Sequence, residues 1–144
     1  MATLETSGID ELQDIFKSIS DWPDNVKTEA LDKMAKVAAS KIKSTGESMG
    51  VRDPNSSAHI LDAITTGKPK MTKSGGHADI SFKGSRPNGR KRLKNSEIAF
   101  IQEYGTRKIT ARPFIGTAMT KSEKQIADAG AEVLGDWIEK TFQK

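Results

Sequence analysis

The sequence has no cysteine, and this absence removes three kinds of chemistry at once. Disulfide bridges, thiolate metal sites and cysteine nucleophiles all need a sulfur atom that the chain does not carry. A cysteine-free chain also fits synthesis in a reducing cytosol. Aromatic residues make up only 6% and hydrophobic residues only 35% of the 144 residues. We therefore expect one domain, 1–144, with a thin core or with a core completed against copies of itself.

Long apolar runs are also missing. No stretch of the sequence approaches the roughly 20 apolar residues that span a membrane. The first residues, MATLETSGIDELQDIF, are acidic and have neither the basic region nor the apolar region of a secretory signal. We therefore expect neither a membrane partner nor export through such a signal.

Residues suited to catalysis are sparse. His59 and His77 lie far apart in the sequence, and neither has an acid–nucleophile pattern near it. The stretch HAD, residues 77–79, places two ligands on one face of a strand, but two ligands alone do not make a metal site. The segments SGG and GSRPNG lack the strand–glycine–lysine–helix arrangement of a phosphate-binding loop. We expect no enzymatic activity, no metal, no cofactor and no small-molecule substrate.

Charge, by contrast, is abundant and unevenly placed. Residues 1–32 hold eight acids and two bases, a net charge of −6, whereas residues 68–112 hold twelve bases and three acids, a net charge of +9. Such separation is typical of an oriented surface, in which one end meets an acidic partner or the oppositely charged face of a neighbour.

Residues 1–44 are predicted to form a helical N-terminal part. Ser7 is expected to cap a first short helix, and Pro23 to begin a second helix that Gly46 stops at about Ser44. The apolar stripes are Ile9, Leu12, Ile15, Phe16 and Ile19 in the first helix, and Val26, Ala30, Leu31, Met34, Val37, Ala38 and Ile42 in the second. Their spacing is that of a buried helical face.

A long C-terminal helix is predicted over 113–142. Thr120 and Glu123 stand at capping-box spacing. The apolar stripe consists of Ile126, Ala129, Val133, Leu134, Trp137, Ile138 and Phe142. These positions recur at the period of a helix that buries one face.

Residues 58–112 are predicted to hold a small sheet, a basic loop and a short helix. AHILDAI, residues 58–64, suits either one or two helical turns or a short strand. Ala78, Ile80 and Phe82 alternate with polar residues as in a half-buried strand, and KSGG before them suits a hairpin turn. Residues 97–104 favour a short helix capped by Ser96, with a strand as the alternative.

These elements together predict an α+β fold. A small antiparallel or mixed β-sheet is expected to pack against a long N-terminal helix and a long C-terminal helix, with an extended basic loop.

The basic loop, residues 83–95, holds six bases and no acid. Its candidate contact residues for phosphate or for a protein partner are Arg86, Arg90, Lys91, Arg92 and Lys94. Cations on a flexible loop can follow a phosphate backbone without reading bases. No aromatic residue is interleaved with them, which argues against stacking on single-stranded bases. A solvated or protein-docking loop is the alternative.

The stretch EYGTRKITARPF, residues 103–114, is sharply punctuated. Gly105 suits the left-handed conformation that ends a helix, and the Thr106 hydroxyl suits hydrogen bonds to freed backbone groups. Arg112 is held extended by the proline that follows it, Pro113 fixes the start of the last helix, and Phe114 is expected to bury its ring. In residues 107–112, apolar and polar side chains alternate as in a strand. This pattern predicts an edge strand that joins the sheet of this chain or of a neighbouring copy.

The sequence IAFIQEYGT, followed by RPFIGTAM, resembles a pattern of the gene-product-ten-like neck proteins of lambdoid bacteriophages. These proteins are called tail-completion, tail-terminator or head–tail joining proteins. In that family, a short apolar helix ends in Glu–aromatic–Gly–Thr, and Pro–Phe then opens a C-terminal helix. The matching positions here are Glu103, Tyr104, Gly105, Thr106, Pro113, Phe114 and Ala118, and Arg112 precedes the proline.

The resemblance implies a structural virion protein of the phage neck or tail, assembled in the cytoplasm of the bacterial host. It implies a homo-oligomeric ring, a hexamer or alternatively a dodecamer, that completes the tail and joins it to the head connector. The implied partners are the head-completion or connector protein, the tail tube or sheath proteins, and double-stranded DNA that passes through the channel. The alternative function is a nucleic-acid-binding module that uses the basic loop 83–94.

Overall fold

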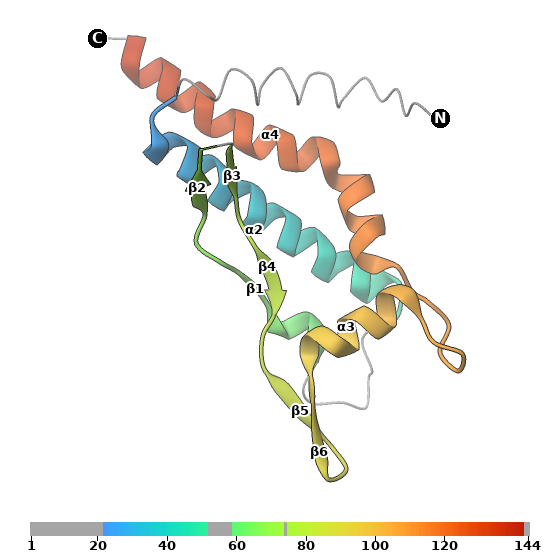
Figure 1. Cartoon of the computed structure of the whole chain (residues 1–144). Helices are drawn as coiled ribbons and strands as arrows, with labels where there is room; N and C mark the ends of the chain where they lie inside the picture. Colours follow the sequence, from blue (N-terminus) through green and yellow to red (C-terminus); the bar gives the residue numbers. More distant parts are fainter. Residues whose placement is uncertain (1–21, 52–58, 74, 143–144) are drawn as a thin grey trace.

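The computed structural model describes residues 22–51, 59–73 and 75–142. Two long helices, α2 (Asp24–Ser48) and α4 (Phe114–Phe142), lie beside short strands and the helix α3 (Asn95–Tyr104) (Figure 1). The other elements are the 3₁₀ helix η1 (Ile60–Ala63) and the strands β1 (Ile64–Thr66), β2 (Lys70–Thr72), β3 (Gly75–His77), β4 (Ile80–Phe82), β5 (Ser85–Asn88) and β6 (Lys91–Lys94). The predicted α+β class is confirmed, and the described strand pairs are antiparallel. The predicted helix capped by Ser7 lies outside the described residues.

The helices α2 and α4 run side by side in opposite directions (Figure 1). Val26 and Ala30 of α2 form a buried cluster with Val133 of α4, as the predicted stripes require. Ile138 and Phe142 of the predicted α4 stripe are exposed instead. Trp22 and Trp137 pack against this cluster, and the centroids of their rings lie 6.5 Å apart. The apolar faces of the two helices therefore cover each other over the N-terminal half of α2.

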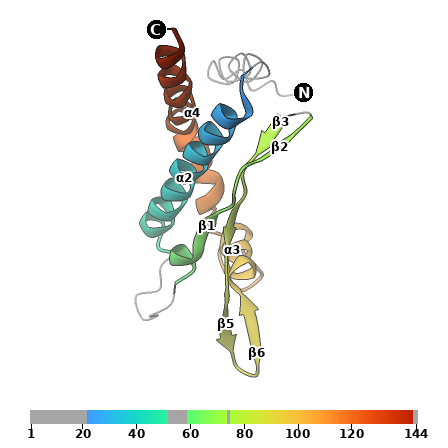
Figure 2. The ribbon, with the colours of Figure 1, turned by 90° about the vertical axis from the view of Figure 1, so that its left-hand side faces the viewer.

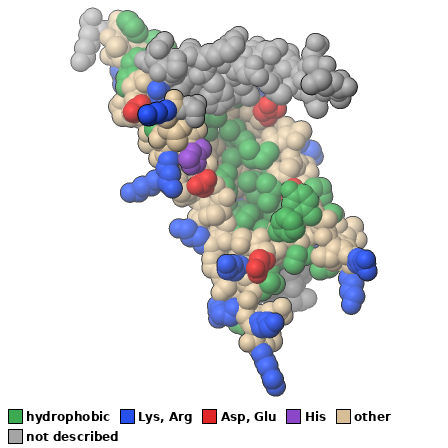
Figure 3. Space-filling model, in the orientation of Figure 1, with side chains coloured by type: hydrophobic (Ala, Val, Ile, Leu, Met, Phe, Trp, Pro, Cys, Tyr) green, Lys and Arg blue, Asp and Glu red, His purple; other side chains and the backbone are tan. Residues whose placement is uncertain are grey.

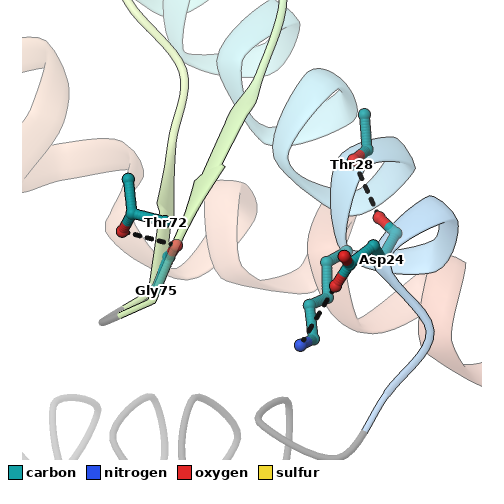
Figure 4. A network of polar contacts seen from close by, with 5 residues as sticks. Asp24, Thr28, Thr72 and Gly75 are labelled. Atoms are coloured by element: carbon teal, nitrogen blue, oxygen red, sulfur yellow. Dashed lines mark hydrogen bonds and ion pairs between the residues drawn. The ribbon is translucent and has the colours of Figure 1, made fainter.

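The start of α2 differs from the prediction by one residue. Pro23 is the N-cap, with an extended ψ of 141°, rather than the first helical residue. Its carbonyl accepts hydrogen bonds from the N–H groups of Val26 and Lys27. Asp24 places a carboxylate in the first turn, where the helix dipole favours a negative charge, and its side chain lies 3.6 Å from the Lys27 ammonium (Figure 4).

The strands β1 to β4 form one long antiparallel ribbon on the side of α2 turned away from α4 (Figure 2). The N–H of Gly67 donates to the Asp79 carbonyl at 2.8 Å and connects the β1–β4 pair with the β2–β3 pair. The hydroxyl of Thr72 donates to the Gly75 carbonyl at 2.9 Å and closes the turn (Figure 4). The hairpin turn predicted within KSGG is confirmed.

The main core lies where the end of α2, η1, β4, α3 and the start of α4 meet. Phe114 and Leu61 are its largest fully buried side chains. The ring of Phe114 packs edge-on against Phe82 of β4, with centroids 6.0 Å apart. Ile80 and Phe82 are half-buried and Ser81 is exposed, as the alternation predicted. Within AHILDAI, the helical alternative is confirmed by η1, and β1 begins only at Ile64, the last residue of the stretch.

The predicted end of α2 is wrong, because the helix continues through Gly46. A Cβ atom on Gly46 would lie 2.6 Å from Cδ2 of Leu61 and 3.2 Å from Cδ2 of Phe114. Position 46 therefore requires glycine, because the side chains of Leu61 and Phe114 occupy the space that a larger side chain would need. The chain leaves the direction of α2 at Gly50, whose φ is 74°. Glycine adopts this left-handed conformation without steric strain.

The basic segment 83–95 is a β-hairpin rather than the predicted loop. β5 and β6 pair antiparallel, with Ser85 opposite Lys94 and Asn88 opposite Lys91. Gly89, with a φ of 61°, supplies the left-handed residue of the tight turn. Strand propensity is low in this segment, so the pairing depends on contacts distant in sequence, which are described below.

Two predicted helix caps are also wrong. α3 begins at Asn95, so Ser96 lies inside the helix. The Glu97 carboxylate instead accepts a hydrogen bond from the N–H of Lys94 at 3.0 Å and satisfies the backbone at this end. Thr120 and Glu123 both lie inside α4, which begins one residue after the predicted start and ends at Phe142 as predicted.

The two glycines at positions 46 and 135 provide a matched test of the close packing. We expect Gly46→Ala to lower the free energy of unfolding by about 1–2 kcal/mol, because overpacking a buried site outweighs the gain in helix propensity. Gly135 lies in α4 with nothing within 4 Å of an added Cβ. Gly135→Ala should therefore raise stability by about 0.5–1 kcal/mol. Urea unfolding measures both, and equal stabilisation by the two variants would contradict the packing assigned to Gly46.

Candidate functional site: a helix corner and a basic hairpin

The punctuated stretch that carries the resemblance forms a corner between α3 and α4. Glu103, in the last turn of α3, accepts hydrogen bonds from the N–H of Ile115 at 2.8 Å and from the N–H of Gly116 at 2.9 Å. These N–H groups belong to the first turn of α4, which has no partners for them within the helix. The carboxylate thus caps α4 and carries a negative charge at the positive end of the helix dipole.

Gly105 ends α3, as predicted. Its φ is 74°, and its N–H donates to the Ile101 carbonyl at 2.7 Å. A Cβ atom on this residue would lie 2.8 Å from both the Ala111 nitrogen and the Ile109 oxygen. The position therefore needs glycine for its conformation and for the close approach of the returning backbone.

The segment 107–112 is not a strand, so the predicted strand within this chain is wrong. The Thr106 hydroxyl accepts hydrogen bonds from the N–H groups of Lys108 and Ile109, at 3.2 and 3.1 Å. The N–H of Thr106 donates in turn to the Ile109 carbonyl at 2.8 Å. The hydroxyl does bond free backbone groups, as predicted, and the resulting turn occupies the N–H groups of Lys108 and Ile109 and the Ile109 carbonyl.

The end of the turn is tied back to α3 before α4 begins. The N–H of Arg112 donates to the Gln102 carbonyl at 2.6 Å. The Pro113 carbonyl accepts from the N–H of Thr117 at 3.0 Å, and the Phe114 ring is completely buried. Pro113 therefore stands directly before the last helix, which begins one residue later than predicted, and the ring is buried as predicted.

The side chain of Tyr104 serves no part of this corner. It is 69% exposed and contacts Phe100, which is 63% exposed, with ring centroids 4.7 Å apart and ring planes tilted by 48°. Ile109 and Met119 are the other large apolar side chains exposed in this part of the chain. A hydrophobic area is visible beside α3 and α4 in Figure 3. Clustered exposed apolar groups of this kind mark surfaces that bind other molecules.

The basic hairpin is anchored at its base by Asn95, which sequence reasoning missed. Asn95 is buried, and its Nδ2 donates to the Lys83 carbonyl at 2.7 Å. Its Oδ1 accepts from Nε of Arg86 at 3.1 Å, and its backbone N–H donates to the Gly84 carbonyl at 3.0 Å. The Asn95 side chain thus ties β5 and the residues that lead into it to the start of α3, into which β6 runs directly. The available sequence signal was an asparagine directly before Ser96, the predicted cap of the helix.

The five candidate cations of the hairpin fall into two groups. Arg86 bonds Asn95, and Arg92 donates to Oγ and to the carbonyl of Ser85, at 2.9 and 3.0 Å. The side chains of Arg90, Lys91 and Lys94 are exposed and have no hydrogen bond or ion pair within the described residues. The hairpin therefore presents cations that the described part of the chain does not neutralise.

The pairing register places these cations on both faces of the hairpin. Paired residues share a face, so Arg86 and Lys91 lie on one face, and Arg92 and Lys94 lie on the other. Arg90 is at the tip. The hairpin extends away from the two long helices at the lower end of the molecule (Figures 1 and 2).

The two histidines do not come together in a site. His59 is buried and caps η1, where Nδ1 accepts from the N–H of Leu61 at 3.3 Å. His77 is exposed on β3. Among residues 22–51, 59–73 and 75–142, no group of three or more potential metal-ligating side chains is present. None of the helices within these ranges has the length and hydrophobicity to cross a membrane.

No protein-family model, curated protein or solved structure matches this chain. Assignment of a function therefore depends on the corner, the exposed aromatic pair and the hairpin, together with the sequence resemblance. The corner and the hairpin are separate surfaces, because they lie at the two ends of α3. Their side chains do not converge on a common cavity.

The cap on α4 predicts a stability effect specific to Glu103. Glu103→Gln should lower the free energy of unfolding by about 1 kcal/mol, because the neutral amide keeps only part of the hydrogen bonding and loses the favourable charge. Glu139→Gln, which removes an exposed charge near the other end of the same helix, should leave stability unchanged or raise it slightly. Thermal unfolding of both variants measures the difference. An equal loss in both would argue against the cap.

Proposed function

We propose that this chain is a structural protein of the neck of a tailed bacteriophage or phage-like particle. Copies of the chain form a ring that completes the tail, joins it to the head connector and leaves a channel for double-stranded DNA. The partners are the connector or head-completion protein on one side and tail proteins on the other. No reaction is catalysed, and the ring works by docking and by sealing the channel.

The proposal rests on one observation: the residues that match the phage neck pattern have structural roles at the corner between α3 and α4. Glu103 caps α4, Gly105 permits the close return of the backbone, and Phe114 fills the core. These positions are separated in sequence but cooperate in one corner. Few other residues could fill these structural roles. A match to the family at these positions is therefore more informative than a similar composition or a similar run of charges.

The exposed surfaces support an assembly role. A closed ring needs heterologous contacts, in which two different surfaces of one copy meet two neighbours. The exposed pair of Phe100 and Tyr104 rings is one candidate for such a surface, and the unneutralised cations of the β5–β6 hairpin are another. Neither is used by the packing of the described chain. Both are available to neighbouring copies or to other neck proteins.

Light scattering across a concentration series, with and without phage tail tubes, tests this function. We expect a ring, or a monomer that binds the ends of tubes and stops their growth. We also expect weak binding to DNA, because a channel through which DNA moves must not hold it tightly. A chain that stays monomeric at every concentration and ignores tubes would remove the proposal.

The second candidate is a nucleic-acid-binding module, which the projecting hairpin favours. If Arg90, Lys91 and Lys94 grip phosphates, binding to duplex DNA should be strong at low salt and fall steeply as salt is added. For three contacts, the logarithm of the binding constant should fall with a slope of about −2.7 against the logarithm of salt concentration. Fluorescence anisotropy with a labelled duplex gives this slope. A flat or absent salt dependence would exclude this candidate.

A further inference from the structure

A group of acidic side chains lies on α4, at the end of the molecule opposite the β5–β6 hairpin (Figure 1). In the second half of α4, Asp128, Glu132, Asp136 and Glu139 are exposed. Their spacing of four, four and three residues places them on one side of the helix, and we call this group the acidic flank. Among the residues described, only Glu132 of this group has an ion-pair partner, the Lys33 ammonium at 3.6 Å.

The acidic flank and the β5–β6 hairpin cannot meet within one copy. The hairpin lies at the lower end of the molecule, and the second half of α4 lies at the upper end (Figure 1). The first residue of the flank follows the start of α4 by roughly 21 Å of helix. The hairpin strands are only roughly 13 Å long and extend in the other direction. A contact between the two surfaces therefore has to join two different copies.

The two surfaces match in chemistry and in number. Three hairpin cations, Arg90, Lys91 and Lys94, have no partner within the described residues. Three acids of the flank, Asp128, Asp136 and Glu139, have no ion pair there either. The flank also approaches the C-terminal end of α4, where the helix dipole favours cations.

We propose that the β5–β6 hairpin of one copy docks against the acidic flank of α4 in the next copy. This inference rests on the proposed ring, and it names one of the contacts by which the ring closes. The contact is heterologous, because a basic end meets an acidic end, and repetition of it produces a directional chain that closes into a ring. Opposite charges at such a contact speed association and fix the register between neighbours.

The hairpin is built to serve as a docking arm of defined direction. Asn95 ties β5 to the buried start of α3, and β6 runs directly into α3, so the base of the hairpin is held at both strands. Arg92 is held by Ser85, and Arg86 is held by Asn95. The unneutralised cations are therefore presented on a supported β-hairpin rather than on a flexible loop. A preorganised arm loses less conformational entropy when it binds.

A protein partner explains the distribution of the cations better than a duplex does. A duplex lying along the hairpin would contact cations on one face, whereas Lys91 and Lys94 lie on opposite faces with Arg90 at the tip. An arm that is received end-on by a neighbouring protein surface uses the tip and both faces. The same chain supplies an acidic surface for this purpose, whereas DNA binding would leave the acidic flank without a role.

Reciprocal charge reversal in the full-length chain tests the contact. The hairpin variant is Arg90→Glu with Lys91→Glu, which leaves the bonds of Arg86 and Arg92 intact. The flank variant is Asp136→Lys with Glu139→Lys, which leaves the Glu132 ion pair intact. The control is Lys70→Glu with Lys73→Glu, an equal change of charge on the exposed β2–β3 hairpin.

We expect each of the first two variants alone to assemble at concentrations about tenfold or more above wild type, because like charges would face each other. An equimolar mixture of the two should assemble within about twofold of wild type, since every contact in an alternating ring is again between opposite charges. Native mass spectrometry should then find the two variants in equal numbers. The control should assemble like wild type, and circular dichroism should show that all four proteins are folded.

The outcomes separate the two proposals. If wild type assembles and the hairpin variant assembles equally well, the hairpin contact is wrong and the ring remains. If both variants are impaired but their mixture is not rescued, the acidic flank is not the surface that receives the hairpin, and the inference fails. If the hairpin variant loses only salt-dependent binding to a DNA duplex, the arm belongs to the nucleic-acid candidate. If wild type neither assembles nor binds tail tubes, the proposed function itself fails, and the contact fails with it.

Discussion

Burial of the Phe114 ring is the interaction on which the arrangement of the elements depends. The ring lies at the start of α4, contacts Phe82 of the β-ribbon and approaches the bare backbone of α2 at Gly46. Burying a phenylalanine side chain contributes roughly 1.5–3 kcal/mol, a large share of the stability of a small domain with few aromatic residues. The surrounding corner, from the Glu103 carboxylate to the turn closed by Thr106, holds the backbone so that this ring points inward.

Features governed by neighbours along the chain were predictable from the sequence. The stripe of Val26 and Ala30 identified the buried face of α2, and Gly105 identified the end of α3. The burial of Phe114 followed from its place directly after Pro113. In each case, helical periodicity or a local backbone preference determines the structure. The α+β class followed from the order of these segments.

Features governed by contacts distant in sequence were not predictable. Glycine commonly ends helices, and Gly46 was predicted to end α2. The core side chains instead require a glycine at this position inside the helix. The segment 83–95 has the composition of a loop, yet Asn95 and Ser85 hold arginines that stabilise it as a hairpin. Glu103 was identified as part of a pattern, but its role as a cap depends on a helix that begins eleven residues later. Only the folded chain brings these partners together.

The two closely packed helical glycines also fix how far α2 can slide. Gly46 receives Leu61 and the Phe114 ring near one end of α2, and near its other half the Met34 side chain fills the space above Gly130, where an added Cβ would lie 2.6 Å from the sulfur. A shift of α2 along its axis would bring a bulkier residue against the ring and move Met34 onto a residue larger than glycine. α2 therefore has a single longitudinal position between α4 and the β-ribbon. Helices that pack through smooth faces can slide between several positions. The packing at Gly46 and Gly130 allows α2 one position, and this position keeps the two ends of the molecule at a constant separation.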